Sequence, residues 1–119
     1  MRVEGVDFIS VPTRDAARAV AWYRDVLGLP TSDYTTLEVE TKNVTLSFWL
    51  PEEQGERFVP NENGIALRVA DVPAAVEEVH TAGGEVIGIE DSGVCLRGYV
   101  KDPDGNVVIL HRRYAPRTK

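Results

Sequence analysis

The hydrophobic and polar positions of the chain follow two periods, one typical of helices and one typical of strands. Apolar residues recur at three- and four-residue spacing in AARAVAWYRDVL (16–27) and in VPAAVEEVHTA (72–82), which predicts two amphipathic helices. Short apolar or alternating segments predict strands at 6–12, 34–41, 44–50, 64–71, 85–91, 94–100 and 107–113. The order strand, helix, strands therefore occurs twice along the chain.

The residues at the ends of these segments repeat as well. Asp15 is a good N-cap for the first predicted helix and Gly28 a good C-terminal stop. The same spacing returns in the second half, where Asp71 and Gly84 take the corresponding positions. Asn43 likewise aligns with Asn106, so the chain has the pattern of a tandem repeat of one supersecondary unit.

The repeat and the loop between its halves predict the domain organisation. The segment PEEQGERFVPNENG (51–64) has no periodicity and is typical of a connection. We therefore expect a single α+β domain, with module 1 at about 1–52, a linker at about 53–62 and module 2 at about 63–119. Two sheets with a helix on one face must enclose or bury something with the other, which favours a ligand cavity between the modules.

Composition narrows the classes of function. The chain has 119 residues and a net charge of -6, which fits one soluble domain and argues against a partner nucleic acid. The sequence contains no apolar run of membrane-spanning length, so we expect no membrane partner. The lone Cys95 cannot form an internal disulfide. We expect it to be a small buried apolar residue, in a protein of a reducing compartment. We therefore expect the protein in the cytoplasm.

Three stretches together resemble a known family. VDFISVPTRDAARAVAWYRDVLGLP, IALRVADVPAAVEEVHTAGGEV and DPDGNVVIL are similar to segments of the vicinal oxygen chelate superfamily, which includes glyoxalase I, extradiol dioxygenases and bleomycin-resistance proteins. The resemblance covers nearly the whole chain. It implies tandem βαβββ modules that form a cupped mixed sheet around a central cavity, commonly in a homodimer. Metal-dependent members use His and Glu ligands on the first and last strands of the modules, and the ion acts as a Lewis acid.

The positions that correspond to those ligands carry no metal-binding group. The resemblance places them at Phe8, Leu46, Gly64 and Ile109. A divalent metal site needs about three ligands from His, Glu, Asp or Cys, and none of these four residues supplies one. We therefore expect no metal and no other cofactor, and no residue of the sequence is assigned a catalytic role.

Period-two alternation places Val107, Ile109 and His111 on one face of the last strand, and the resemblance turns that face inward. The resulting wall is mostly apolar with a few polar groups, which suits a small organic ligand. The predicted ligand-binding residues are Phe8, Ser10, Leu46, Phe48, Arg97, Tyr99, Ile109 and His111.

Three functions remain open at this point. The first is a metal-free, bleomycin-resistance-like protein that binds a small hydrophobic or aromatic molecule in the cavity. The second is a lyase, isomerase or dioxygenase of the same family, with substitute metal ligands such as Glu38, Glu40 and His111 or with His111 as base. The third is a vestigial or regulatory domain whose dimer surface is the part that matters. The sequence also leaves open whether the cavity is filled, and whether the modules pair within one chain or across a dimer.

Overall fold

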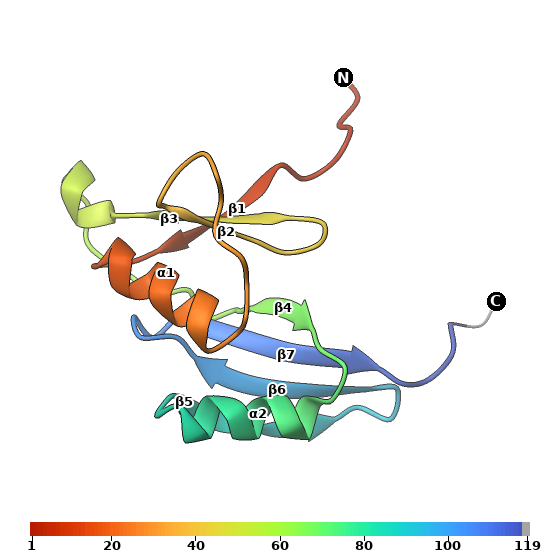
Figure 1. The fold of residues 1–119 in the computed structure, drawn as a ribbon. Helices are drawn as coiled ribbons and strands as arrows, with labels where there is room; N and C mark the ends of the chain where they lie inside the picture. The colour runs from red at the N-terminus through yellow and green to blue at the C-terminus, as the bar shows by residue number, and fades with distance from the viewer. Residues whose placement is uncertain (118–119) are drawn as a thin grey trace. The chain divides into compact units, whose positions relative to one another are not determined.

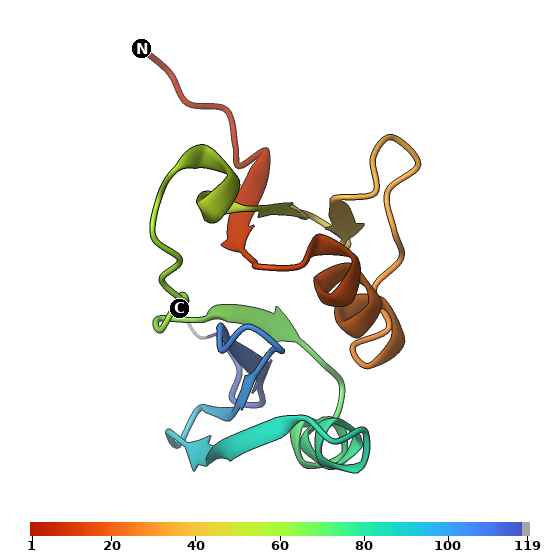
Figure 2. The same cartoon turned by 90° about the vertical axis from the view of Figure 1, so that its left-hand side faces the viewer.

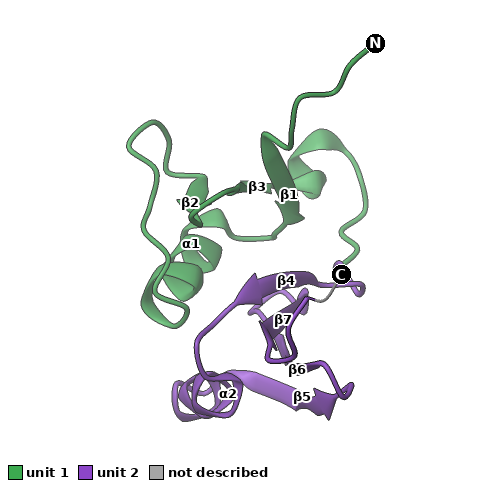
Figure 3. Cartoon of the chain, turned by 90° about the vertical axis from the view of Figure 1, so that its right-hand side faces the viewer, with its two compact units in different colours: residues 1–60 green, residues 61–119 purple. Residues whose placement is uncertain are grey.

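A computed structural model describes residues 1–117, and the chain forms two compact units that meet at Pro60 and Asn61 (Figure 3). Unit 1 comprises Met1–Pro60, and unit 2 the residues from Asn61 onward. Both contain a helix and a mixed sheet (Figure 1). Within each unit, the first and last strands lie side by side and run parallel.

Unit 1 has a three-stranded sheet of order β1-β3-β2. Strand β3 runs parallel to β1 and antiparallel to β2. An isolated bridge from Thr31 to Val39 adds a short fourth position beside β2, in the place of the strand that follows the helix in unit 2. The elements are β1 (Phe8–Pro12), α1 (Ala16–Asp25), β2 (Glu38–Glu40), β3 (Thr45–Trp49) and the short 3-10 helix η1 (Pro51–Gln54).

Unit 2 contains the fuller version of the same plan, a four-stranded sheet of order β4-β7-β6-β5. Its elements are β4 (Ile65–Arg68), α2 (Val72–Thr81), β5 (Glu85–Asp91), β6 (Cys95–Lys101) and β7 (Val107–Arg113). Figure 2 shows α2 along one side of this sheet. The prediction of an α+β fold built from two βαβββ modules is confirmed, with one strand of unit 1 reduced to the Thr31 bridge.

Both helices begin at an aspartate. The Asp15 carboxylate accepts a hydrogen bond from the backbone N–H of Arg18 at 3.1 Å, and Asp71 accepts one from Ala74 at 3.0 Å. Each bond satisfies one of the amide groups that the first helical turn leaves without a partner. The prediction of Asp15 as an N-cap is confirmed, and Asp71 plays the same part in unit 2.

The core of unit 1 lies between α1 and one face of its sheet. Tyr23 of α1 meets Phe48 of β3 with ring centroids 5.0 Å apart, a separation typical of favourable aromatic pairs. Both side chains are buried, together with Val11, Val39 and Leu46. Burying each large apolar side chain contributes about 1.5–3 kcal/mol relative to leaving it exposed.

The core of unit 2 is built in the same way, from one face of its helix and alternate residues of its strands. Val72, Val76 and Val79 of α2 are buried against the sheet, as are Val100, Val108 and Leu110. The helix lies close to the sheet at Gly98, where an added Cβ would be 2.4 Å from a Val76 methyl carbon. The absence of a side chain at this strand position therefore permits the close approach of α2.

The turn before β7 contains two buried polar side chains that hydrogen-bond to each other. The Asp102 carboxylate accepts hydrogen bonds from the Asn106 backbone N–H at 2.9 Å and from its side-chain amide at 2.8 Å. The Asn106 side-chain oxygen accepts in turn from the backbone N–H of Asn61 at 2.8 Å. Both side chains are nearly inaccessible, so this DPDGN segment fixes the start of β7 against the chain that leads into β4.

Gly98→Ala tests the close helix approach. We expect a loss of about 1–3 kcal/mol in the free energy of unfolding, because overpacking a core of β-branched residues forces a shift of α2. Urea denaturation measures it. The matched control is Gly88→Ala in β5, where an added Cβ meets nothing within 4 Å. Equal stability of the two variants would contradict this description of the core.

Asn106→Ala tests the buried turn. The substitution leaves a carboxylate oxygen of Asp102 and the N–H of Asn61 without these partners, and each such loss costs about 1–3 kcal/mol. The control is Asn43→Ala, the exposed asparagine of the corresponding turn in unit 1, for which we expect a change within about 0.5 kcal/mol. Thermal and urea unfolding of both variants would show whether the difference exists.

Candidate functional site

In each unit, the sheet has one face covered by the helix and one face that the helix does not touch, here called the helix-free face. Side chains alternate between the two along each strand. In unit 2, the buried Val108 and Leu110 of β7 face α2, so Val107, Ile109 and His111 lie on the helix-free face, as the alternation predicts. The face also carries Ala66, Arg68, Glu90, Arg97, Tyr99 and Lys101.

The strand register arranges these residues in two neighbouring rows across unit 2. In the first row, His111 of β7 lies between Arg68 of β4 and Arg97 of β6. In the second row, Ile109 lies between Ala66 and Tyr99 of the same two strands. A row of basic side chains therefore runs alongside a row of apolar and aromatic ones.

A hydrogen-bonded cluster closes one end of the first row. The Tyr99 hydroxyl donates to Glu90 at 3.2 Å, and the Arg97 guanidinium lies 3.7 Å from the same carboxylate oxygen. A hydrogen bond to the Tyr99 hydroxyl raises the pKa of Arg97 above its usual value, and the charge interaction with Tyr99 adds to this. Like any arginine, Arg97 keeps its positive charge at all physiological pH values, and it carries that charge beside the Glu90 carboxylate.

The helix-free face of unit 1 is different in character. It presents Phe8 and Ser10 of β1, Thr45, Ser47 and Trp49 of β3, and Glu38 and Glu40 of β2. The Phe8 side chain is 57% exposed, while the Thr45 hydroxyl donates to Glu40 at 2.6 Å. The face combines an exposed aromatic residue with hydroxyl and carboxylate groups.

Two predicted site residues lie on the other face of unit 1. Leu46 and Phe48 are 1% and 2% exposed and pack beneath α1, where Phe48 meets Tyr23. The prediction that they share a face with Phe8 and Ser10 is wrong, since Leu46 pairs with Ile9 and Phe48 with Val11.

The cause of the error is a difference in turn length. The turn of unit 1 closes with a hydrogen bond from Thr41 to Val44, whereas the turn of unit 2 closes from Asp102 to Asn106 and contains one more residue. Aligning the two asparagines therefore shifts one strand by a single residue, and such a shift exchanges its faces. The counterpart of Ile109 is Ser47, not Leu46.

The corrected ligand positions of the resemblance are Phe8, Ser47, Gly64 and Ile109, and this set does not fit a divalent metal. Only Ser47 offers an oxygen, and a neutral hydroxyl is a poor substitute for carboxylate and imidazole ligands. Gly64 has φ +81°, and an added Cβ would lie 3.0 Å from Val107 and 3.1 Å from Ile109. Within residues 1–117, no three His, Cys, Asp or Glu side chains form a group able to hold a metal.

A separate groove lies within unit 1, between α1 and the segment Thr31–Thr36. It has a volume of about 490 Å³ and is lined largely by hydroxyl-bearing residues together with Ala17, Val20 and Arg24. The Arg24 guanidinium is held by Asp25 at 2.7 Å, so its charge is already compensated. Sequence patterns did not predict this groove, because it depends on the path of an irregular segment.

The residue of the helix-free faces that sequence patterns missed is Arg68. The alternation of side chains in β4 could be seen in the sequence. The position of Arg68 beside His111, however, follows from the parallel register of β4 and β7, which a sequence pattern does not reveal.

Cys95 is buried, as predicted, with its sulfur 3.3 Å from the Ser92 hydroxyl. For the part of the chain described, the structure contains no helix with the length and apolar character to cross a membrane.

Comparisons with known proteins agree with this fold. No curated protein sequence matches the chain. A member of the glyoxalase/bleomycin resistance protein/dioxygenase superfamily from Sphaerobacter thermophilus is similar in structure, with a TM-score of 0.79, 20% identity, and coverage of 92% of this chain and 97% of that one. TnmS3 from Streptomyces sp., described as an antibiotic-binding protein, has a TM-score of 0.76 and 24% identity, covering 96% and 99%.

A lactoylglutathione lyase from Agrobacterium tumefaciens is also similar, with a TM-score of 0.73 and 18% identity over 92% of this chain and 94% of the lyase. Binding proteins and enzymes thus share this fold, and fold alone does not select between them. The family model of the Glyoxalase/Bleomycin resistance protein/Dioxygenase superfamily matches residues 5–110. The chain therefore belongs to that superfamily.

Proposed function

We propose that the protein binds a small hydrophobic or aromatic molecule without a metal, and that the helix-free face of unit 2 contacts it. The observation that carries the proposal is the set Phe8, Ser47, Gly64 and Ile109 at the positions where metal-dependent relatives place their ligands. These residues remove Lewis-acid chemistry of the family's kind and leave apolar surface in its place. The antibiotic-binding TnmS3 supports a binding role within this fold.

The centre of the proposed contact is the pair Ile109 and Tyr99, which face each other across β7 and β6. Both are partly exposed in the structure, so a ligand would bury apolar area that the fold leaves accessible. Aromatic rings favour stacked or edge contacts with such side chains. Phe8 and Ser10 lie on the helix-free face of unit 1, and their assignment to ligand binding is a separate prediction for that unit.

The enzyme alternative has less support. Glu38 and Glu40 lie on the helix-free face of unit 1. Among the residues that the structure describes, no third His, Cys, Asp or Glu side chain joins them to form a group that could hold a metal ion. His111 is half-buried and lacks a side-chain partner within the described residues, so no residue orients it as a general base is oriented in hydrolytic triads. Binding is therefore the function that the geometry favours.

We propose that the protein acts as a homodimer, as the resemblance to the superfamily implies. We also propose that it works in the cytoplasm, because a lone cysteine is typical of a reducing compartment. Light scattering behind a sizing column would give twice the mass of one chain if the homodimer proposal is right.

The binding role is tested with N-phenyl-1-naphthylamine, a neutral aromatic probe whose fluorescence rises in apolar surroundings. We expect saturable binding that is unchanged after treatment with EDTA. Ile109→Gln should weaken it on the order of tenfold, since a lost apolar contact of this size is worth about 1–1.5 kcal/mol. Ile89→Gln is the control, because Ile89 is 48% exposed on the opposite face of the same sheet.

Three results would speak against the proposal. The probe could fail to bind, or the two isoleucine variants could weaken it equally. Loss of binding with EDTA, restored by a divalent ion, would instead favour the metal-dependent alternative.

A further inference from the structure

The row Arg68, His111 and Arg97 across unit 2, here called the basic row, is not needed to bind a neutral molecule. We propose that it recognises a single anionic group on the ligand, so that the natural ligand is an aromatic acid. The inference rests on the proposed function, since it places the charged end of the same ligand.

The basic row is set by backbone pairing. His111 is the direct register partner of Arg68 in the parallel pair and of Arg97 in the antiparallel pair. Neighbouring strands lie about 4.8 Å apart, so the three Cα atoms span about 10 Å. Side chains that are directly opposite each other on one face can interact, so one bound group can contact neighbouring members of the row.

The members of the basic row differ in what already compensates them. Arg97 shares Glu90 with Tyr99 at the β5 end. Within residues 1–117, the side chains of Arg68 and His111 make no hydrogen bond or ion pair. The next cation on this face, Lys101, lies 3.8 Å from Glu85. The uncompensated charge is therefore concentrated at the β4 and β7 end, on Arg68.

The positive charge of the basic row contrasts with the negative net charge of the whole chain. The net charge is -6, which on average repels an anionic ligand, yet the helix-free face of unit 2 gathers arginines around one histidine. Arginine binds carboxylates through two parallel N–H groups and keeps its charge at all physiological pH values. A carboxylate is thus the group that Arg68 is best suited to hold, with His111 as a second donor or polar neighbour.

The apolar row beside it sets the kind of molecule. Ile109 lies two residues before His111 on β7, and Tyr99 lies two residues after Arg97 on β6. Two residues along a strand correspond to a rise of about 7 Å. That distance is within the combined reach of a small fused aromatic acid and a long arginine side chain. The two rows together fit a planar ring over Ile109 and Tyr99 with its acid group over the basic row.

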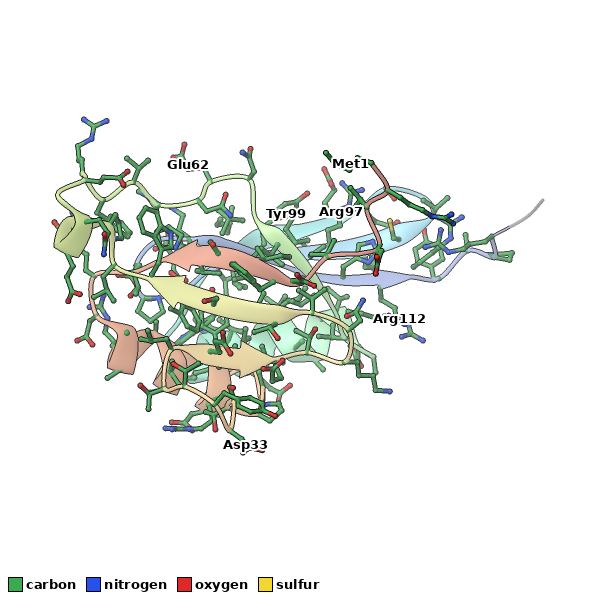
Figure 4. All side chains as sticks on the ribbon, turned by 90° about the horizontal axis from the view of Figure 1, so that it is seen from above. Met1, Asp33, Glu62, Arg97, Tyr99 and Arg112 are labelled. Carbon is green, nitrogen blue, oxygen red and sulfur yellow. The ribbon has the colours of Figure 1, made fainter. Side chains whose placement is uncertain are left out.

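Arg112 offers a matched control. It is on the same strand as His111 but pairs with Leu96, so it projects from the other side of the sheet. Figure 4 shows Arg97 and Tyr99 on one side of the sheet and Arg112 on the other. Replacing Arg68 or Arg112 with methionine removes the same charge from the two faces in turn.

The experiment displaces N-phenyl-1-naphthylamine from the full chain with 2-naphthoate or with the neutral 2-naphthamide. We expect the carboxylate to compete at least roughly fivefold better, a value consistent with one exposed ion pair. Arg68→Met should remove this preference, while Arg112→Met should leave it intact. Raising the salt concentration to 1 M should shrink it as well, because exposed charges are screened.

The outcomes separate the two claims. If the probe binds and the carboxylate and the amide compete equally, the anion proposal is wrong while the binding function stands. If Arg112→Met removes the preference as much as Arg68→Met, overall charge is responsible and the basic row is not. If neither the probe nor either naphthalene compound binds, both claims are overturned together. Loss of the preference in Arg68→Met alone supports the basic row.

Discussion

Each unit of this protein depends on the packing of one helix against one face of a sheet. Because the helix buries alternate residues of every strand, the remaining residues are assigned to the other face without further choice. Tyr23 against Phe48 makes this assignment in unit 1, and Val76 against Gly98 makes it in unit 2. Any chemistry that the sheets carry must then come from the helix-free faces, and their composition decides what the protein can bind.

The fold was largely readable from the sequence, and the reasons are local. Asp15 caps its helix through its own side chain, and the alternation in β7 is uninterrupted, so its two faces were assigned correctly. The error at Leu46 and Phe48 arose where local patterns were insufficient. The register of β3 depends on the number of residues in a turn, and the repeated asparagine suggested an alignment that the backbone does not follow. Arg68 was missed for a related reason, since its neighbours belong to a strand far along the chain.

The two helix-free faces present organic side chains at positions to which the resemblance to the superfamily assigns metal ligands. Phe8 and Ile109 are two of these positions, and the strands place both side chains on the helix-free faces. Under the proposed function, apolar contact and the charge of arginine would act there in place of coordination to an ion. Binding through such groups requires no bound metal, and its strength depends on how well a ring and an anion match two adjacent rows.

The backbone conformation at Gly64 restricts which residues this position can hold. Its left-handed backbone, at φ +81°, strains any other residue placed here, and an added Cβ would lie 3.0 Å from Val107 and 3.1 Å from Ile109, so these neighbours would have to shift slightly. Change at residue 64 is therefore limited first by the backbone, before any contact that the helix-free face makes.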